Sequence, residues 1–278
     1  VACAVFLKMQ SARKSVEPDT TGHIWDENLQ EYNNPMPRWW AWMFYLTVFF
    51  SLGYLVLYPG LGNYAGTLGW TQVQQLEDET KAANAQFGPI YDKFAKLDVA
   101  EVAKSPEALA IGQKLFLNNC AQCHASDAGG SRGFPNLTDK DWLWGGTPEA
   151  IKTSIAEGRT GVMPPFGPVL GESGTKDVAH YVMSLSGSAH DSIRKARGEP
   201  LFKTSCAACH GADGKGNQQL GAPNLTDKTW LRGSGEVAIV EQVTRGSTNQ
   251  MPAHKDILSP PKIHLLTAYV YSLSAPPK

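Results

Sequence analysis

The sequence predicts an all-α protein in which one transmembrane helix precedes two tandem helical domains. Three observations support this fold class: an uncharged apolar run over residues 39–58, a Cys-x-x-Cys-His pentapeptide that occurs twice, and an internal repeat in the second half of the chain. With 42% hydrophobic and 18% charged residues, the composition is that of a globular protein. The net charge of −1 provides no basic surface for nucleic acid, so we expect no nucleic-acid partner.

The N-terminal part of the chain is read from its charge pattern. Residues 1–7 are apolar and basic residues follow, which favours the end of an earlier transmembrane helix over an unstructured stub. Residues 8–38 are polar with several turn signals, so we predict an irregular loop there. Basic residues close to a membrane mark its cytoplasmic side. The loop is therefore expected to be cytoplasmic; its basic residues are Lys8, Arg13, Lys14 and Arg38.

Residues 39–58 are the predicted transmembrane helix. About 20 residues at a rise of 1.5 Å cross the ~30 Å hydrocarbon core, and aromatic residues gather at both ends of this run, as they do at membrane interfaces. The alternative is a buried helix of a soluble core. Residues 59–105 then form a periplasmic spacer, with one helix predicted over 71–86 and a second over 89–104.

The region from residue 106 onward is an internal duplication. The hexapeptide Pro-Asn-Leu-Thr-Asp-Lys at 135–140 recurs at 223–228, and Met163-Pro164 recurs as Met251-Pro252, both 88 positions apart. The pentapeptides are 86 apart, so two residues are inserted just after the second one. We predict one domain over 106–190 and another over 191–278, separated by a linker at 187–197. Each copy has a helix leading into the pentapeptide, a short helix, a Met-containing loop and a closing helix.

The two pentapeptides are attachment motifs for c-type haem. Their sulfurs would bind the two vinyl groups of the macrocycle, and the adjacent histidine would ligate the iron. A redox dithiol or half of a zinc site is the alternative, which two copies, each with a downstream methionine, argue against. We predict two covalently bound haem c groups, and therefore a periplasmic location for this part of the chain. The predicted attachment residues are Cys120, Cys123 and His124, and Cys206, Cys209 and His210.

Methionines are the predicted sixth ligands of the two irons. Met163 lies 39 residues after His124, and Met251 lies 41 residues after His210, so we expect each to serve the haem of its own copy. Thioether opposite imidazole raises the reduction potential and closes the iron to substrates. The alternative role of a methionine is to fill a core.

Some neighbouring residues are candidates for supporting roles. His254 follows Met251 on the same loop and is a weaker competitor for the iron. Pro135 and Pro223 are expected behind the ligating histidines, where a free carbonyl would orient the imidazole. Trp142 and Trp230 are expected at the haem periphery. The helix order of each copy resembles the class I cytochrome c fold, in which the first and last helices cross.

The whole chain resembles the membrane-anchored dihaem subunit, subunit III, of cbb3-type cytochrome c oxidases. The most specific stretches are Gly-His-Ile-Trp-Asp at 22–26, Glu-Tyr-Asn-Asn-Pro-Met-Pro-Arg-Trp-Trp at 31–40 and Tyr-Pro-Gly at 58–60. Members of that family often have an additional N-terminal helix, of which only the end would be present here.

The resemblance implies that both haems are His/Met ligated and pass single electrons to a monohaem c-type subunit and then to the haem–copper subunit that reduces oxygen. It also implies a bacterial inner membrane with the haem domains in the periplasm. The chain alone would have no catalytic site and would be an oxidoreductase only within the oxidase. Residues 191–278 hold 11 Lys and Arg against 7 Asp and Glu, so we expect a donor c-type cytochrome to dock there.

Two other functions stay open on the sequence. One is a membrane-anchored dihaem carrier that serves another respiratory enzyme. The segment over residues 22–40 argues against this function. The other is a dihaem peroxidase, which needs one iron with an open or displaceable ligand; a carbon monoxide difference spectrum distinguishes it.

Overall fold

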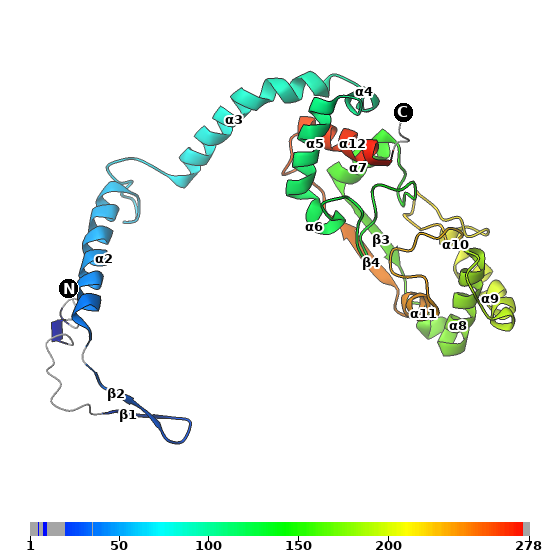
Figure 1. The fold of residues 1–278 in the computed structure, drawn as a ribbon, viewed down its shortest axis with the longest axis horizontal. Helices are drawn as coiled ribbons and strands as arrows, with labels where there is room; N and C mark the ends of the chain where they lie inside the picture. Colours follow the sequence, from blue (N-terminus) through cyan, green and yellow to red (C-terminus); the bar gives the residue numbers. More distant parts are fainter. Residues whose placement is uncertain (1–4, 6–7, 10–19, 35, 275–278) are drawn as a thin grey trace. The chain divides into compact units, whose positions relative to one another are not determined.

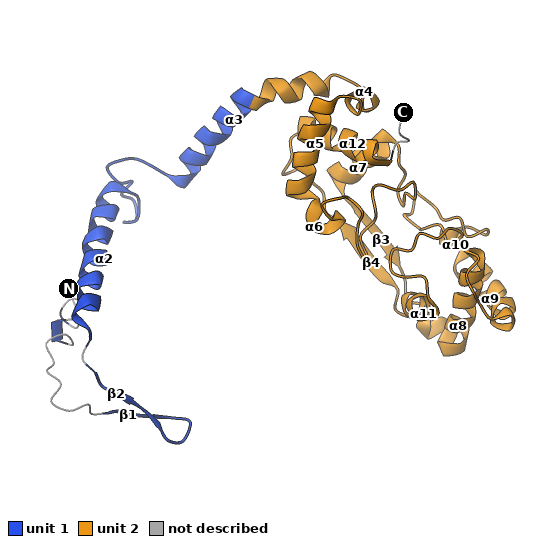
Figure 2. Cartoon of the chain, in the orientation of Figure 1, with its two compact units in different colours: residues 1–86 blue, residues 87–278 orange. Residues whose placement is uncertain are grey.

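The structure is a computed structural model that describes residue 5, residues 8–9, residues 20–34 and residues 36–274. The chain divides into two compact units, residues 1–86 and residues 87–278 (Figure 2). The helix end predicted over residues 1–7 lies outside the described residues, apart from Val5.

A β-hairpin occupies part of the loop that the sequence predicted to be irregular. Strands β1 (Thr20–Trp25) and β2 (Leu29–Tyr32) pair antiparallel (Figure 1). The prediction was wrong here because β-branched and aromatic residues favour strands, and because the turn accepts two left-handed residues. Asp26 and Glu27, in the three-residue turn between Trp25 and Leu29, have φ of 41° and 70°, in the left-handed region.

Helix α2 (Arg38–Leu57) coincides with the predicted transmembrane segment to within one residue. An 18-residue window of this 20-residue helix has a mean hydropathy of 1.6, and it is the one helix among the described residues that is long and apolar enough to cross a membrane. Large apolar side chains such as Phe49 and Phe50 are exposed, and Ala41 is the one buried residue of the helix. A helix that is apolar on all sides and uncovered within its own unit fits a lipid environment.

Helix α3 (Gln72–Ala95) passes through Pro89, where the sequence predicted a break between two helices. A proline inside a helix removes one hydrogen bond, and the helix continues through that position here. A single short helix, α4 (Val99–Val102), follows. Phe94 and Val102 are buried against the C-terminal helix, and the imidazole Nε2 of His264 donates to the carbonyl oxygen of Leu97 over 2.9 Å.

Most helices of the duplicated region lie where the sequence predicted them. Ser105 and Thr147 cap two of them through their side-chain oxygens. Two expectations differ: the linker is helical from Ser192 onward because Asp191 caps it, and the methionine loops are strands. The elements are α5 (Pro106–Asn119), α6 (Ala121–His124), α7 (Pro148–Glu157), β3 (Arg159–Met163), α8 (Gly167–Leu185), α9 (Ser192–Ser205), α10 (Ala207–His210), α11 (Glu236–Arg245), β4 (Ser247–Met251) and α12 (Pro260–Ser274).

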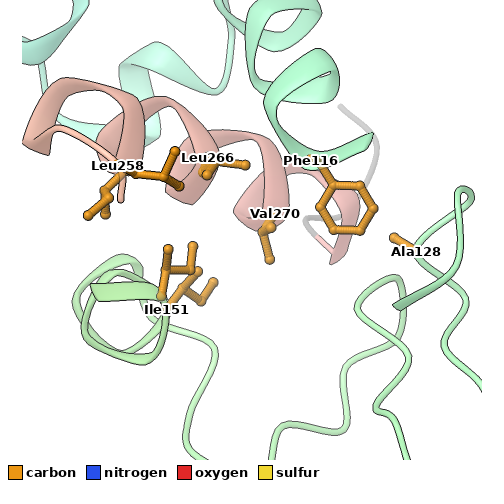
Figure 3. Packing of buried hydrophobic residues seen from close by; sticks show 8 residues of the cluster. Phe116, Ala128, Ile151, Leu258, Leu266 and Val270 are labelled. Atoms are coloured by element: carbon orange, nitrogen blue, oxygen red, sulfur yellow. The ribbon is translucent and has the colours of Figure 1, made fainter. Parts of the chain in front are cut away.

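The closing helices are exchanged between the two copies. Helix α12, from the second copy, packs on α5 and α7 of the first copy, whereas α8 packs on α9 and α11 of the second. Figure 3 shows Val270 of α12 between Ile151 of α7 and Phe116 of α5. We call this the first core; its buried residues are Phe116, Ala128, Ile151, Ile155, Leu258, Ile263, Leu266 and Val270.

The second core is built from the equivalent helices, with the contributions of the two copies interchanged. It combines α8 of the first copy with α9 and α11 of the second; its buried residues are Val178, Ala179, Tyr181, Val182, Phe202, Cys206, Ile239 and Val243. The first and last helices therefore do cross, as in the class I cytochrome c fold, but across copies rather than within one. The boundaries of the sequence repeats are not the boundaries of the packed cores. The charge balance of residues 191–278 consequently does not describe one core.

Helix crossing depends on a glycine in each leading helix. A Cβ at Gly112 of α5 would meet Tyr269 of α12, and a Cβ at Gly198 of α9 would meet the backbone of Asp177 in α8. Asp177 is buried and pairs with Arg194 and Arg197 of α9 at 3.0 and 3.1 Å. The absence of a side chain at the crossing thus brings the exchanged helix into direct backbone contact.

Strands β3 and β4 are the exchange point, and Figure 1 shows them between the two sets of helices. They pair antiparallel with Gly161 opposite Asn249, and these two residues are themselves repeat equivalents, 88 positions apart. The pair therefore lies on a local two-fold axis, and each strand continues past it to the opposite core. Gly158 and Gly246 precede the strands with φ of 71° and 65°. A Cβ at either would strike the carbonyl region of the opposite strand's methionine.

Candidate haem sites

Each Cys-x-x-Cys-His motif begins where the leading helix ends. The His124 N–H donates to the Cys120 carbonyl oxygen over 3.0 Å, and the His210 N–H donates to that of Cys206 over 3.0 Å. The four-residue helices α6 and α10 carry the second cysteine and the histidine, and the first cysteine, Cys120 or Cys206, is the residue that caps each helix. This is the local arrangement that attachment of a haem c through two thioethers requires.

The histidines of the two motifs are oriented by the proline carbonyls, as the sequence predicted. Nδ1 of His124 donates to the Pro135 carbonyl oxygen over 3.0 Å, and Nδ1 of His210 donates to that of Pro223 over 3.1 Å. With Nδ1 protonated and bonded, the lone pair of Nε2 is free to bind a metal. Burial lowers the pKa of both imidazoles, and His254 lowers that of His124 further, so the neutral, ligating form is favoured.

The repeated hexapeptide builds the support for these histidines. The side-chain oxygen of Asn136 accepts from the Thr138 N–H over 2.8 Å and from its hydroxyl over 2.7 Å. Asn224 and Thr226 repeat both bonds. This Asx turn fixes the backbone just after the proline whose carbonyl holds the imidazole. Both copies therefore keep the same Asx turn beside the proline carbonyl that orients the histidine.

The cysteines do not have the properties of a redox dithiol. Burial, and to a smaller degree Cys123, raises the pKa of the Cys120 thiol to about 11. Burial and Cys209 likewise raise the pKa of Cys206 to about 11. A reactive dithiol needs a lowered pKa. Among the described residues, no group of three or more His, Cys, Asp or Glu could hold a bare metal ion.

The methionines lie at the cores opposite to those the sequence predicted. Met251 packs against the first core together with Cys120 and Ala121, whereas Met163 packs against the second core beside Cys206. Each methionine therefore packs with the Cys-x-x-Cys-His motif of the other copy, and not with that of its own copy as expected. The physical reason is the antiparallel pairing of β3 and β4, which carries each methionine across the local axis. Sequence spacing alone cannot distinguish the two pairings, because both copies have the same order of elements.

His254 lies at the first core and lacks a partner. Its side chain is 8% exposed, and its Nδ1 is the one buried side-chain polar atom among the described residues that has no hydrogen bond. The equivalent position in the other copy is Phe166. A buried polar atom normally has a partner, so an orphaned nitrogen beside this motif fits a group with hydrogen-bond acceptors. Together with two thiols, a neutral imidazole and a thioether, the residues fit a haem c.

The other histidines of this unit are already engaged. Nδ1 of His180 accepts from the Asp191 N–H over 3.0 Å, and Nδ1 of His190 donates to the Ser188 carbonyl oxygen over 2.8 Å. His264 holds Leu97, as described above. Trp142 and Trp230 pack against the first and second cores, and their place at the haem periphery stays a prediction.

Sequence reasoning missed one polar side chain at these sites. Gln242 of α11 donates to the sulfur of Met163 over 3.4 Å. Its repeat equivalent is Ser154, so the only signal in the sequence is a break in the repeat symmetry.

Comparison with known proteins matches the N-terminal part of the chain and each of the two repeats to a family model. Residues 17–65 match the family model described as the N-terminal domain of cytochrome oxidase-cbb3, FixP. Residues 107–182 and 194–270 each match the model described as cytochrome C oxidase, cbb3-type, subunit III. The chain is 52% identical to the cbb3-type cytochrome c oxidase subunit CcoP of Rubrivivax gelatinosus, covering 99% of this chain and 90% of the relative. It is 43% identical to the subunit FixP of Azorhizobium caulinodans, covering 92% and 93% of the two chains.

Proposed function

The chain belongs to the family of subunit III of cbb3-type cytochrome c oxidases, and we propose that it carries two His/Met-ligated haem c groups that pass single electrons toward the oxygen-reducing subunit. The observation that carries this proposal is the composition of the two cores. Each combines a Cys-x-x-Cys-His motif of one copy with a methionine of the other.

The residues assigned to each haem follow from the cores. The first haem is held by Cys120 and Cys123, with His124 and Met251 as axial ligands. The second is held by Cys206 and Cys209, with His210 and Met163. Haem iron supplies reversible one-electron chemistry, and the protein supplies its orientation and potential. With a histidine and a methionine of this chain holding each iron, the chain would have no catalytic site of its own.

The ladder between the cores supports electron passage from one haem to the other. Met163 lies opposite Ser247, four residues along β4 from Met251. At about 3.4 Å per residue, the Cα atoms of the two methionines are roughly 14 Å apart. Both haems would therefore lie on either side of a single pair of strands.

The anchor supports a place in the membrane complex. Helix α2 fits a membrane span, and basic residues precede it, which favours a cytoplasmic N-terminal side and a periplasmic haem unit. The proposed partners are the haem–copper subunit, a monohaem c-type subunit and a donor c-type cytochrome. The proposed location is the bacterial inner membrane.

The crossed ligation is tested in a one-haem chain. C206A/C209A leaves only the haem on Cys120; M251A or M163A is then added. Carbon monoxide binds a ferrous haem that has lost its sixth ligand. We expect binding in the chain with M251A and none in the chain with M163A. The reverse result would restore pairing within each copy.

Membership of the complex is tested by gentle extraction. Reduced-minus-oxidised spectra of the purified assembly should show b-type haem beside the c-type bands, together with oxygen reduction. Only c-type haem in a lone polypeptide would favour a free-standing carrier. Carbon monoxide binding to the unaltered chain would favour a peroxidase.

A further inference from the structure

Gln242 reaches the sulfur of one proposed iron ligand. Its Nε2 donates to the Met163 sulfur over 3.4 Å and to the Ser247 hydroxyl oxygen over 2.7 Å. A primary amide has two N–H donors and a thioether sulfur is a weak acceptor, so both bonds can form at once. Gln242 is half-buried, which partly shields these bonds from water.

A network holds this amide in place. The Ser247 hydroxyl oxygen also accepts from Nδ2 of Asn249 over 3.3 Å, and Oδ1 of Asn249 accepts from the Arg232 guanidinium. Linked hydrogen bonds of this kind fix the orientation of their members. The donor aimed at Met163 is therefore positioned by residues on β4 and on the loop before α11.

The first copy has no equivalent of this network. Ser154 stands in place of Gln242; its hydroxyl donates to the Ala150 carbonyl oxygen over 2.8 Å and accepts from Arg159 over 2.9 Å. The other equivalents also differ: Arg159 for Ser247, Gly161 for Asn249 and Trp144 for Arg232. In the part of the chain that the structure describes, no hydrogen bond reaches the Met251 sulfur.

We propose that Gln242 is a positioning residue that raises the reduction potential of the haem ligated by Met163. The inference rests on the proposed ligation by that methionine. A thioether sulfur has two lone pairs; when one binds iron, the other can accept the amide N–H. The hydrogen bond withdraws electron density from sulfur, which makes it a weaker donor and favours the ferrous iron. It also selects which lone pair faces the metal.

The test is a spectroelectrochemical titration of the full two-haem chain. Q242L removes the donor at similar volume, and S154A is the matched control in the first copy. We expect the reduction equilibrium constant of one haem to fall about threefold to tenfold in Q242L, tenfold being 59 mV for a one-electron couple. The second haem should keep its potential. Q242L shifts one of the two reduction potentials, and S154A should leave that potential unchanged.

The far-red absorption band of ferric thioether-ligated haem separates tuning from loss of the ligand. The band should persist in Q242L, and the shifted potential should be the one that remains when C120A/C123A removes the first haem. Q242E, which keeps the size of the side chain, should lower the same potential and serves if Q242L accumulates poorly.

Two unchanged potentials, an equal fall of both, or a shift confined to the haem on Cys120 would overturn the proposal. If M163A instead leaves the band of the second haem intact, the ligation itself fails, which is a different failure.

Discussion

Truncating Leu266 should weaken the haem site of the other sequence copy. Leu266 is fully buried in the first core, although it belongs to the closing helix of the second copy. Replacing a buried leucine by alanine costs about 3 kcal/mol through lost transfer energy and a residual cavity. Local opening of the first haem site should then become about a hundredfold more frequent. Val178→Ala, the repeat equivalent in the second core, should cost about 2 kcal/mol there.

The assay is a guanidinium titration followed by proton NMR of the haem methyl groups. Resonances missing from C120A/C123A belong to the first haem, and those missing from C206A/C209A belong to the second. In L266A the first haem's resonances should be lost at lower denaturant, and V178A should show the opposite order. If L266A weakens the haem on Cys206 instead, the closing helices pack within their own copies and the exchange is refuted.

Three further substitutions probe the exchange point, the buried ion pair and the acid response. Gly246→Ala should destabilise the second haem site by at least about 1 kcal/mol, because the φ of Gly246 is 65° and a Cβ there would strike the Met163 carbonyl. Gly235→Ala is the control and should be neutral in the same titration, because Gly235 has open space around it and a negative φ. Asp177→Asn should lower the free energy of unfolding in denaturant by about 3 kcal/mol, because it leaves two arginines of α9 without their carboxylate. K176A, which removes the exposed ion pair between Lys176 and Glu172, is the control and should cost under about 0.5 kcal/mol. Burial lowers the pKa of His264, so the contribution of His264 to stability is present above the unfolded pKa of about 6.5 and is lost as pH falls toward the folded value. His264→Gln should therefore make the free energy of unfolding depend less on pH in that acid range. An unchanged pH dependence would contradict the role of His264.

The sequence predicts the parts of this protein better than their connections. Cys120 and His124 could be found because haem attachment needs those residue types at fixed spacing. Pro135 could be placed behind the histidine because the hexapeptide recurs at a constant distance from the pentapeptide. Isolated bridges join Ser131 to Phe134 and Asn217 to Ala222, so the inserted pair of residues does fall in the loop after the second motif. Local chemistry and repeat spacing are thus sufficient for these features.

The exchange could not be predicted because it leaves no local trace. Helix α12 would bury the same apolar face on α5 or on α9, since Phe116 and Phe202 are repeat equivalents and meet Tyr269 and Tyr181 at similar ring distances of 5.5 and 5.1 Å. Strands β3 and β4 decide which leading helix α12 packs on. Their sequences contain glycine and polar residues, which predict a loop. Only their antiparallel pairing in three dimensions fixes which core receives which methionine.

The exchange leaves the second site within one continuous segment and divides the first site between two segments. Residues 163–245 supply every helix and both proposed axial ligands of the second core, whereas the first core needs segments on both sides of that stretch. Neither repeat, taken alone, contains a complete site: the first lacks Met251 and α12, and the second lacks Met163 and α8. A change in β3 therefore acts on the haem that its own copy does not attach. Asymmetry between the haems, such as the Gln242 contact, can consequently arise from single substitutions near the local axis while both helical frameworks stay the same.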